Sequence, residues 1–202
     1  MKLYITPGSP YARMARIVVF EKGLEQRVEI VIAQTRLADS PYYRINPSGR
    51  VPYLVRGDGV GMEESSVICA YLDHFDGKPV FDLPDGDQAW EARRLEASAR
   101  SMMDGLAVWS REITRPQDER SPTVIQHEAH RSERMARLWE TEIDHPLMHG
   151  ALNLTQITLA CALGLEARIP EYQWRSAHPR LLAWFERIAA RPSFAATAPP
   201  GA

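Results

Sequence analysis

Ser9 and the pair Glu64-Ser65 stand where the sequence predicts two helices to begin, and this placement could give them a chemical role. Ser9 precedes Pro10, a residue typical of the first helical position. The first N–H groups of a helix have no partner inside the helix and lie at the positive end of its dipole. They therefore stabilise an anion such as a thiolate or a carboxylate. Each serine could equally act only as a helix cap.

The pair Glu64-Ser65 has the composition of a binding site for an amino-acid head group. Ser65 and its backbone N–H would bind a carboxylate, while Glu64 would pair with an ammonium. Helix capping is again the alternative. Among the arginines near these segments, Arg36 or Arg50 could hold a second carboxylate, although each could also lie simply at the surface.

The dipeptide Val51-Pro52 could present its backbone to a ligand. If the peptide bond is cis, the N–H and C=O of Val51 turn outward, where they could pair with the peptide of a ligand. Only about 5% of X–Pro bonds are cis in folded proteins, so the sequence alone does not favour this form. A proline at the start of a strand is the alternative.

The elements that would position these residues follow the order βαβ and then ββα, typical of a small α/β domain. The predicted strands cover residues 2–5, 28–32, 51–55 and 60–62, and the predicted helices cover 9–23 and 65–75. Gly23 is expected to end the first helix, and residues 57–59 are expected to form a hairpin turn. Residues 36–46 should be irregular or a short broken helix, because Pro41 disfavours helical geometry at Ser40.

Residues beyond a linker rich in glycine and proline, at 76–88, show only helical patterns. Helices are predicted over 92–113, from Ser121 onward, over 155–165 and over 178–192. Apolar residues at spacings of three and four mark one face of the first helix: Ala92, Leu95, Ala99, Met102, Leu106, Trp109 and Ile113. The segment 155–165 is almost wholly apolar and should be buried. The tail 195–202 is expected to fray.

The composition excludes several classes of protein. The chain has 202 residues, of which 45% are hydrophobic and 25% charged, as in ordinary globular proteins. Its 24 basic and 26 acidic residues leave a net charge of -2, which argues against a nucleic-acid binder. Two distant cysteines and six histidines without a ligand spacing indicate no metal site. No signal peptide or membrane span is predicted, so a cytoplasmic location is expected.

Three segments together strongly resemble the glutathione S-transferase family, as a bacterial, serine-type member: "TPGSPYARMARIVVFEKG", "INPSGRVPYLV" and "MEESSVICAYLDHF". The C-terminal "HPRLLAWFERIAARPSF" is similar to bacterial members as well. The resemblance implies a thioredoxin-like, glutathione-binding α/β domain at residues 1–77 and a linker at 78–87. An all-α domain that binds the electrophile would then cover residues 88–202.

The resemblance also implies a role for each candidate residue. Ser9 falls on the catalytic position, and "SPYA" resembles the thioredoxin-type C-P-Y-C with serine at the first cysteine. Pro52 falls on the family's cis-proline, and Val51 on the residue whose backbone binds the cysteinyl part of glutathione. Glu64 and Ser65 fall on the pair that holds the γ-glutamyl end. Tyr4 and Tyr11 are alternatives to Ser9 as the group that activates the thiol.

The expected activity is transfer of glutathione to an electrophilic, apolar small molecule by a homodimer without a metal. The alternatives are a specialised glutathione-dependent isomerase, dehalogenase or lyase, and a non-catalytic binding or regulatory protein. Serine at position 9 excludes disulfide exchange through a mixed disulfide with the enzyme. The expected walls of the electrophile pocket are Tyr11, Met102, Met103, Leu106 and Trp109, all of which could equally be core residues.

One departure from the family concerns a helix cap in the second half of the chain. The family usually has Ser or Thr followed three residues later by Asp, but here Thr155 is followed by Thr158. With Thr155 as the cap, the reciprocal carboxylate is missing, so Thr158→Asp is expected to raise the melting temperature.

Overall fold

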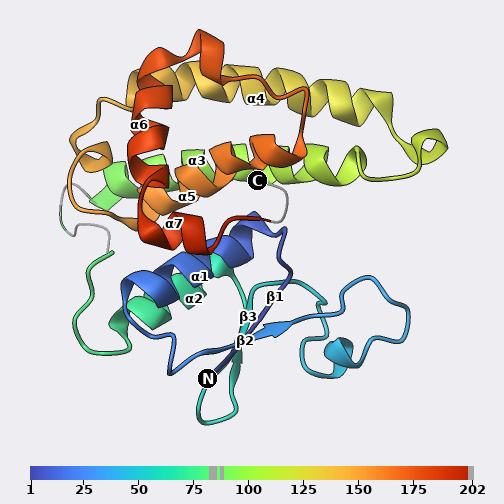
Figure 1. The fold of residues 1–202 in the computed structure, drawn as a ribbon, viewed down its shortest axis with the longest axis vertical. Helices are drawn as coiled ribbons and strands as arrows, with labels where there is room; N and C mark the ends of the chain where they lie inside the picture. The colour runs from blue at the N-terminus through green and yellow to red at the C-terminus, as the bar shows by residue number, and fades with distance from the viewer. Residues whose placement is uncertain (82–85, 87–88, 200–202) are drawn as a thin grey trace. The chain divides into compact units, whose positions relative to one another are not determined.

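The computed structural model describes residues 1–81, 86 and 89–199 and divides into two compact units (Figure 1). Unit 1 comprises residues 1–81 together with 196–199, and unit 2 comprises residues 89–195. Of the linker expected at 78–87, residues 82–85 and 87 lie outside the described residues.

Unit 1 has the thioredoxin-like order of elements that the sequence predicts. The elements are β1 (Lys2–Ile5), α1 (Pro10–Glu21), β2 (Glu29–Ile32), η1 (Pro41–Arg44), β3 (Tyr53–Val55), β4 (Gly61–Met62) and α2 (Ser65–His74). The strands form one sheet in the order β2-β1-β3-β4, with β1 and β2 parallel and the other pairs antiparallel. The short turn η1 is the broken helix expected around Pro41.

Helix α1 begins and ends at the residues that the sequence indicates. Ser9 is its N-cap and Pro10 its first residue, and Gly23 follows the C-cap Lys22 with a φ of +60°, which glycine adopts without a steric penalty. Figure 1 shows α1 and α2 side by side. Apolar side chains of α1 and α2 and of β1 and β3 are buried and form the core of the unit: Leu3, Met14, Ile17, Leu54, Ile68 and Leu72.

The strand register brings several chain segments to one end of the sheet. Ile5 pairs with Ile32 in the parallel pair, so β1 and β2 end at the same edge. Because Tyr4 pairs with Tyr53 in an antiparallel pair, β3 begins at that edge. Strand β4 runs antiparallel to β3 and therefore ends there too. Helices α1 and α2, which follow β1 and β4, both begin at this edge.

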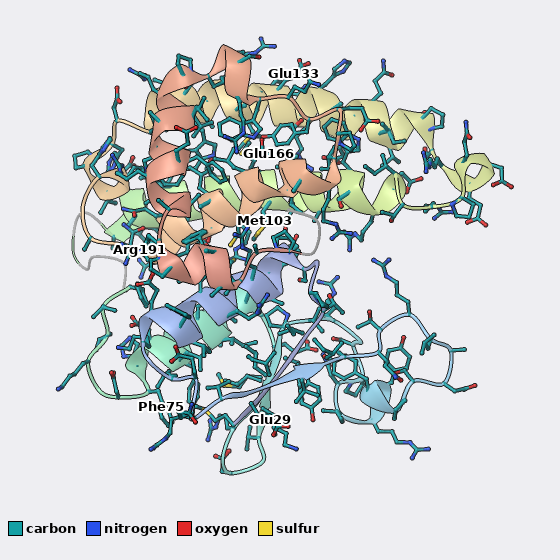
Figure 2. All side chains as sticks on the ribbon, viewed as in Figure 1. Glu29, Phe75, Met103, Glu133, Glu166 and Arg191 are labelled. Carbon is teal, nitrogen blue, oxygen red and sulfur yellow. The ribbon has the colours of Figure 1, made fainter. Side chains whose placement is uncertain are left out.

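Unit 2 is helical, as the sequence predicts. Its elements are α3 (Ala89–Glu112), η3 (Gln117–Glu119), α4 (Pro122–Glu142), η4 (Pro146–Met148), α5 (Leu154–Leu163), η5 (Gly164–Arg168), η6 (Arg175–Ala177), α6 (Pro179–Ala189) and α7 (Pro192–Ala196). Helix α3 packs against α4 and α5, and α6 also contacts α4 and α5. The apolar face predicted for this helix is buried except at Ile113, which follows α3 and is half-buried. Met103, labelled in Figure 2, is buried as well.

The cap expected at Thr155 is wrong. Asn153 is the N-cap of α5, and its Oδ1 accepts a hydrogen bond from the N–H of Gln156 at 3.1 Å. Thr158 is 0% exposed, and its hydroxyl donates to the carbonyl of Leu154 at 2.8 Å. Since position 158 is buried inside the helix, the physical basis for a stabilising Thr158→Asp is absent: the substitution would bury a carboxylate.

The fraying expected for the tail is wrong at Ala196 and Thr197, which are held by hydrogen bonds; residues 200–202 lie outside the described ones. Thr197 is only 4% exposed, because the tail segment lies on α1. Arg16 donates to the carbonyl of Thr197 at 3.2 Å and to that of Ala196 at 3.3 Å. Burial, and secondly the charge of Arg13, lower the pKa of Arg16 from its ordinary value. The charged guanidinium of Arg16 thus orders a tail segment whose composition alone predicts disorder.

Within the part of the chain that the structure describes, no helix is long and apolar enough to cross a membrane.

Candidate functional site

Ser9 caps α1 and keeps its hydroxyl hydrogen available. Its Oγ accepts a hydrogen bond from the N–H of Ala12 at 3.2 Å, and its own N–H donates to the carbonyl of Thr6 at 3.1 Å. The hydroxyl hydrogen has no acceptor among the residues that the structure describes. The half-buried side chain can therefore cap the helix and donate to an incoming anion at the same time.

The start of α2 has an unusual backbone. Glu64 is the N-cap with φ +70° and ψ 118°, a conformation that L-residues other than glycine rarely adopt. Its carboxylate accepts from the hydroxyl of Ser65 at 3.3 Å and from the N–H of Ser66 at 3.5 Å. Ser65 is 3% exposed, whereas Glu64 is exposed. Such strain persists where the surroundings impose it, which is common at ligand sites.

The backbone of Val51 is a candidate for binding the peptide of a ligand. The Val51–Pro52 peptide bond is cis. Neither the N–H nor the C=O of Val51 has a hydrogen-bond partner among the described residues, and Val51 is half-buried. A buried or half-buried backbone group usually finds a partner, so this pair is available to a ligand's peptide.

The strand register brings Ser9, Val51 and Glu64-Ser65 to the same end of the sheet. The pairing of Tyr4 with Tyr53, continued past the strands, sets Thr6 opposite Val51. The pairing of Leu54 with Met62, continued likewise, sets Pro52 opposite Glu64. One sheet edge thus carries two helix N-termini, a hydroxyl donor, a carboxylate and the backbone pair of Val51, which has no partner among the described residues. That set suits a ligand with both an ammonium and several anionic groups.

The two candidate arginines lie on loops at this edge and are both exposed. Arg36 follows β2 and has φ +66°, and its N–H donates to the hydroxyl of Tyr43 at 2.9 Å. Arg50 precedes β3, and its N–H donates to Oγ of Ser48 at 3.2 Å. Neither guanidinium has an ion-pair partner among the described residues, so either could hold a carboxylate.

Most of the residues expected to line an electrophile pocket are buried. Tyr11 is half-buried on α1, whereas the four on α3 are buried: Met102, Met103, Leu106 and Trp109. The ring of Trp109 packs against that of Tyr172, with 6.0 Å between centroids. Their role as pocket walls stays a prediction.

Sequence reasoning missed two polar residues beneath the Val51 loop, Tyr42 and Asn46. Both are buried, and both donate to the carbonyl of Arg50. The turn-forming composition of residues 46–49 indicates a loop, but no periodicity marks a buried amide inside one.

Known proteins resemble this chain over its whole length. The family model of the glutathione S-transferase N-terminal domain matches residues 8–74. An uncharacterized GST-like protein of Escherichia coli (strain K12), YibF, is 31% identical over 204 residues, covering 100% of both chains. Glutathione S-transferase 3 of Zea mays is 28% identical over 98% of this chain and 92% of that protein.

Two solved structures of a glutathione transferase family member from Pseudomonas fluorescens Pf-5 superpose closely. The structure with bound glutathione has a TM-score of 0.90 at 30% identity and covers 98% of both chains. The structure with bound S-(propanoic acid)-glutathione has a TM-score of 0.86 at 31% identity, covering 99% of this chain and 100% of that one. Full-length identity at this level, together with the fold, shows that the chain belongs to the glutathione S-transferase family.

Proposed function

We propose that this protein is a glutathione transferase that activates the thiol of glutathione for attack on electrophilic, apolar small molecules. The observation that carries the proposal is the sheet edge at which Ser9, Val51 and the pair Glu64-Ser65 meet. Relatives that bind glutathione align with essentially the whole chain, which supports the same ligand here.

The free backbone pair and the second helix start would hold the tripeptide. The N–H and C=O of Val51 would pair with the cysteinyl part, in line with their lack of partners among the described residues. The γ-glutamyl carboxylate would bind Ser65 and the first N–H groups of α2, while the exposed carboxylate of Glu64 would pair with the ammonium. Arg36 or Arg50 would bind the glycyl carboxylate.

Ser9 would favour the thiolate form of the bound thiol. A free thiol titrates near pH 8.5, so an enzyme working near neutral pH must lower the thiol pKa. The Ser9 hydroxyl would donate to the sulfur at the positive end of α1. Lowering the pKa by about two units needs about 2.7 kcal/mol, which a charge-assisted hydrogen bond and the dipole supply together.

The chemical step joins sulfur to carbon. The thiol loses its proton to solvent, the sulfur forms a bond to the electrophilic carbon, and the leaving group departs with the bonding electrons. Where the electrophile is an activated double bond, a proton from solvent completes the addition instead. The Ser9 hydroxyl donates to the sulfur before attack and releases it as the bond forms.

The wider expectations belong to the same proposal: a role in detoxification, a cytoplasmic location and a homodimer. We place Trp90 on α3 in the proposed dimer interface, because its aromatic side chain is 76% exposed and aromatic residues are enriched in interfaces. Sedimentation of the wild type and of Trp90→Ala would test the dimer, which should weaken in the variant. A wild type that sediments as a monomer would remove this part of the proposal.

Calorimetry with glutathione tests the proposal, with wild type beside Ser65→Ala and Ser98→Ala. Ser98, a half-buried serine on α3, controls for a serine lost elsewhere. Wild type and Ser98→Ala should bind glutathione in the micromolar to low millimolar range, and Ser65→Ala should bind about tenfold more weakly, which is about 1.4 kcal/mol. A wild type that does not bind would overturn the proposal. Binding without turnover of any electrophile in a screen would favour a non-catalytic glutathione-binding protein.

A further inference from the structure

The carbonyl of Arg50 accepts hydrogen bonds from two buried side chains. The hydroxyl of Tyr42 donates to it at 2.5 Å, and Nδ2 of Asn46 donates at 3.0 Å. Tyr42 is 3% and Asn46 1% exposed. A carbonyl oxygen has two lone pairs, so both are used by donors shielded from water.

The two donors are themselves held in place. The ring of Tyr42 packs against that of Tyr4 on β1, with 5.5 Å between centroids. Oδ1 of Asn46 accepts from the N–H of Ser48 at 3.1 Å, and its backbone N–H donates to the carbonyl of Tyr42 at 2.8 Å. Burial raises the pKa of Tyr42 above its ordinary value, which keeps the phenol a donor at neutral pH.

The Arg50 carbonyl lies in the same peptide unit as the N–H of Val51. The peptide bond is planar, and in a trans unit these two groups point in opposite directions. The bond between Arg50 and Val51 is not among the cis bonds of the described residues. Two hydrogen bonds to the carbonyl therefore fix the direction in which the Val51 N–H points.

We propose that Tyr42 and Asn46 are positioning residues that aim the Val51 N–H at the cysteinyl part of bound glutathione. The inference rests on the proposed function, because it takes glutathione as the ligand of Val51. Neither residue touches the ligand in this account; both act through the Arg50–Val51 peptide. Loss of either hydrogen bond to the Arg50 carbonyl should weaken glutathione binding, because the Arg50–Val51 peptide must then be ordered when the ligand binds.

The test combines calorimetry with nuclear magnetic resonance relaxation on Tyr42→Phe, which removes one hydroxyl and keeps the ring against Tyr4. Tyr71→Phe makes the same chemical change on α2 and serves as the control. We expect Tyr42→Phe to weaken glutathione binding about fivefold, as for one lost hydrogen bond. The order parameter of the Val51 amide in the ligand-free protein should fall from about 0.85, typical of rigid backbone, in Tyr42→Phe and stay unchanged in Tyr71→Phe.

Asn46→Ala provides a second variant if Tyr42→Phe does not fold. It should also weaken glutathione binding and lower the order parameter of the Val51 amide. A general loss of stability would not lower the order parameter at Val51 alone when measured well below the melting temperature. Unchanged affinity and an unchanged Val51 order parameter in both variants would overturn the inference while leaving the proposed function intact.

A wild type that does not bind glutathione would overturn the proposed function and, with it, the ligand named here. The relaxation measurement would then decide the positioning alone. A lower order parameter at Val51 would support it, and an unchanged one would refute it.

Discussion

Helices α1 and α4 begin in nearly the same way, but the backbone N–H of the capping serine meets a different acceptor in each. Each starts with Ser-Pro: Ser9 has φ −81° and ψ 120°, and Ser121 has φ −91° and ψ 107°. The two serine Oγ atoms accept from the N–H three residues later, at 3.2 Å and 3.3 Å respectively. As helix caps, the two serines are equivalent.

The difference lies in what surrounds each start. The N–H of Ser121 donates to the carboxylate of Glu112 at 2.6 Å, so an anion from the chain itself already occupies the positive end of α4. The N–H of Ser9 donates to a neutral carbonyl, that of Thr6. The start of α1 also lies at the sheet edge with Val51 and Glu64. A serine cap is thus a better candidate for chemistry where its N–H meets a neutral carbonyl than where it meets a carboxylate of the chain itself.

The largest expected effect concerns turnover. Ser9→Ala should lower kcat/KM for glutathione conjugation by about 10²–10³-fold, as when one donor to a developing or stabilised anion is removed. Ser121→Ala, which removes the matching cap, should leave kcat/KM unchanged. The measurement is the conjugation rate with an activated aryl halide, for both variants under the same conditions. Wild-type turnover in Ser9→Ala would move the role to Tyr4, Tyr11 or backbone N–H groups.

Removing the internal anion should have the next largest effect, and only on stability. Glu112→Ala removes the carboxylate that accepts from the Ser121 N–H at the start of α4. The loss should destabilise the protein by about 2 kcal/mol. Urea unfolding would measure it. A loss below a few tenths of a kcal/mol would show that the Glu112 carboxylate does not stabilise the start of α4, and the contrast with α1 would then be wrong.

The two serine caps should contribute equally to stability. Ser9→Ala and Ser121→Ala should each lower the free energy of unfolding by about 1 kcal/mol, the usual contribution of an N-cap. Equal losses of stability in the two variants would show that a difference in their turnover does not arise from the loss of a helix cap. A loss in one variant several times that in the other would show that the two starts are not matched.

The smallest effect extends the comparison to the start of α2. Glu64 has φ +70°, so Glu64→Gly should relieve strain and stabilise the fold by about 1 kcal/mol, or about 2–4 °C in melting temperature. The same variant should bind glutathione more weakly, since the carboxylate for the ammonium is gone. Scanning calorimetry would measure the change in melting temperature, and titration calorimetry would measure the change in glutathione affinity. A lower melting temperature would show that the Glu64 carboxylate contributes more to stability than the strain removes.

The fold could be predicted from sequence where one local signal decides each element. Ser-Pro starts, the glycine after α1 and the apolar face of α3 depend on short-range patterns, and the structure confirms them. The cap of α5 was misplaced by two residues because Asn153 and Thr155 both suit an N-cap, and only packing distinguishes them. The order of the tail depends on Arg16, distant in sequence, which no local pattern reveals.

The candidate site could be predicted only in part, for the same reason. Its residue types were visible in the sequence, but the unpartnered backbone of Val51, the strain at Glu64 and the buried donors Tyr42 and Asn46 are products of tertiary structure. The anion at the start of α4 is likewise visible only once the loop from Glu112 to Ser121 has folded.

The most direct test of the central claim is the pKa of the thiol of bound glutathione, followed by the ultraviolet absorbance of the thiolate as pH is raised. On wild type the account predicts a pKa about two units below the 8.5 of a free thiol. On Ser9→Ala the pKa should return most of the way towards 8.5, and on Ser121→Ala it should match wild type. A wild-type pKa of about 8.5, or one that Ser9→Ala does not change, would contradict the claim that Ser9, at the start of α1, stabilises the thiolate.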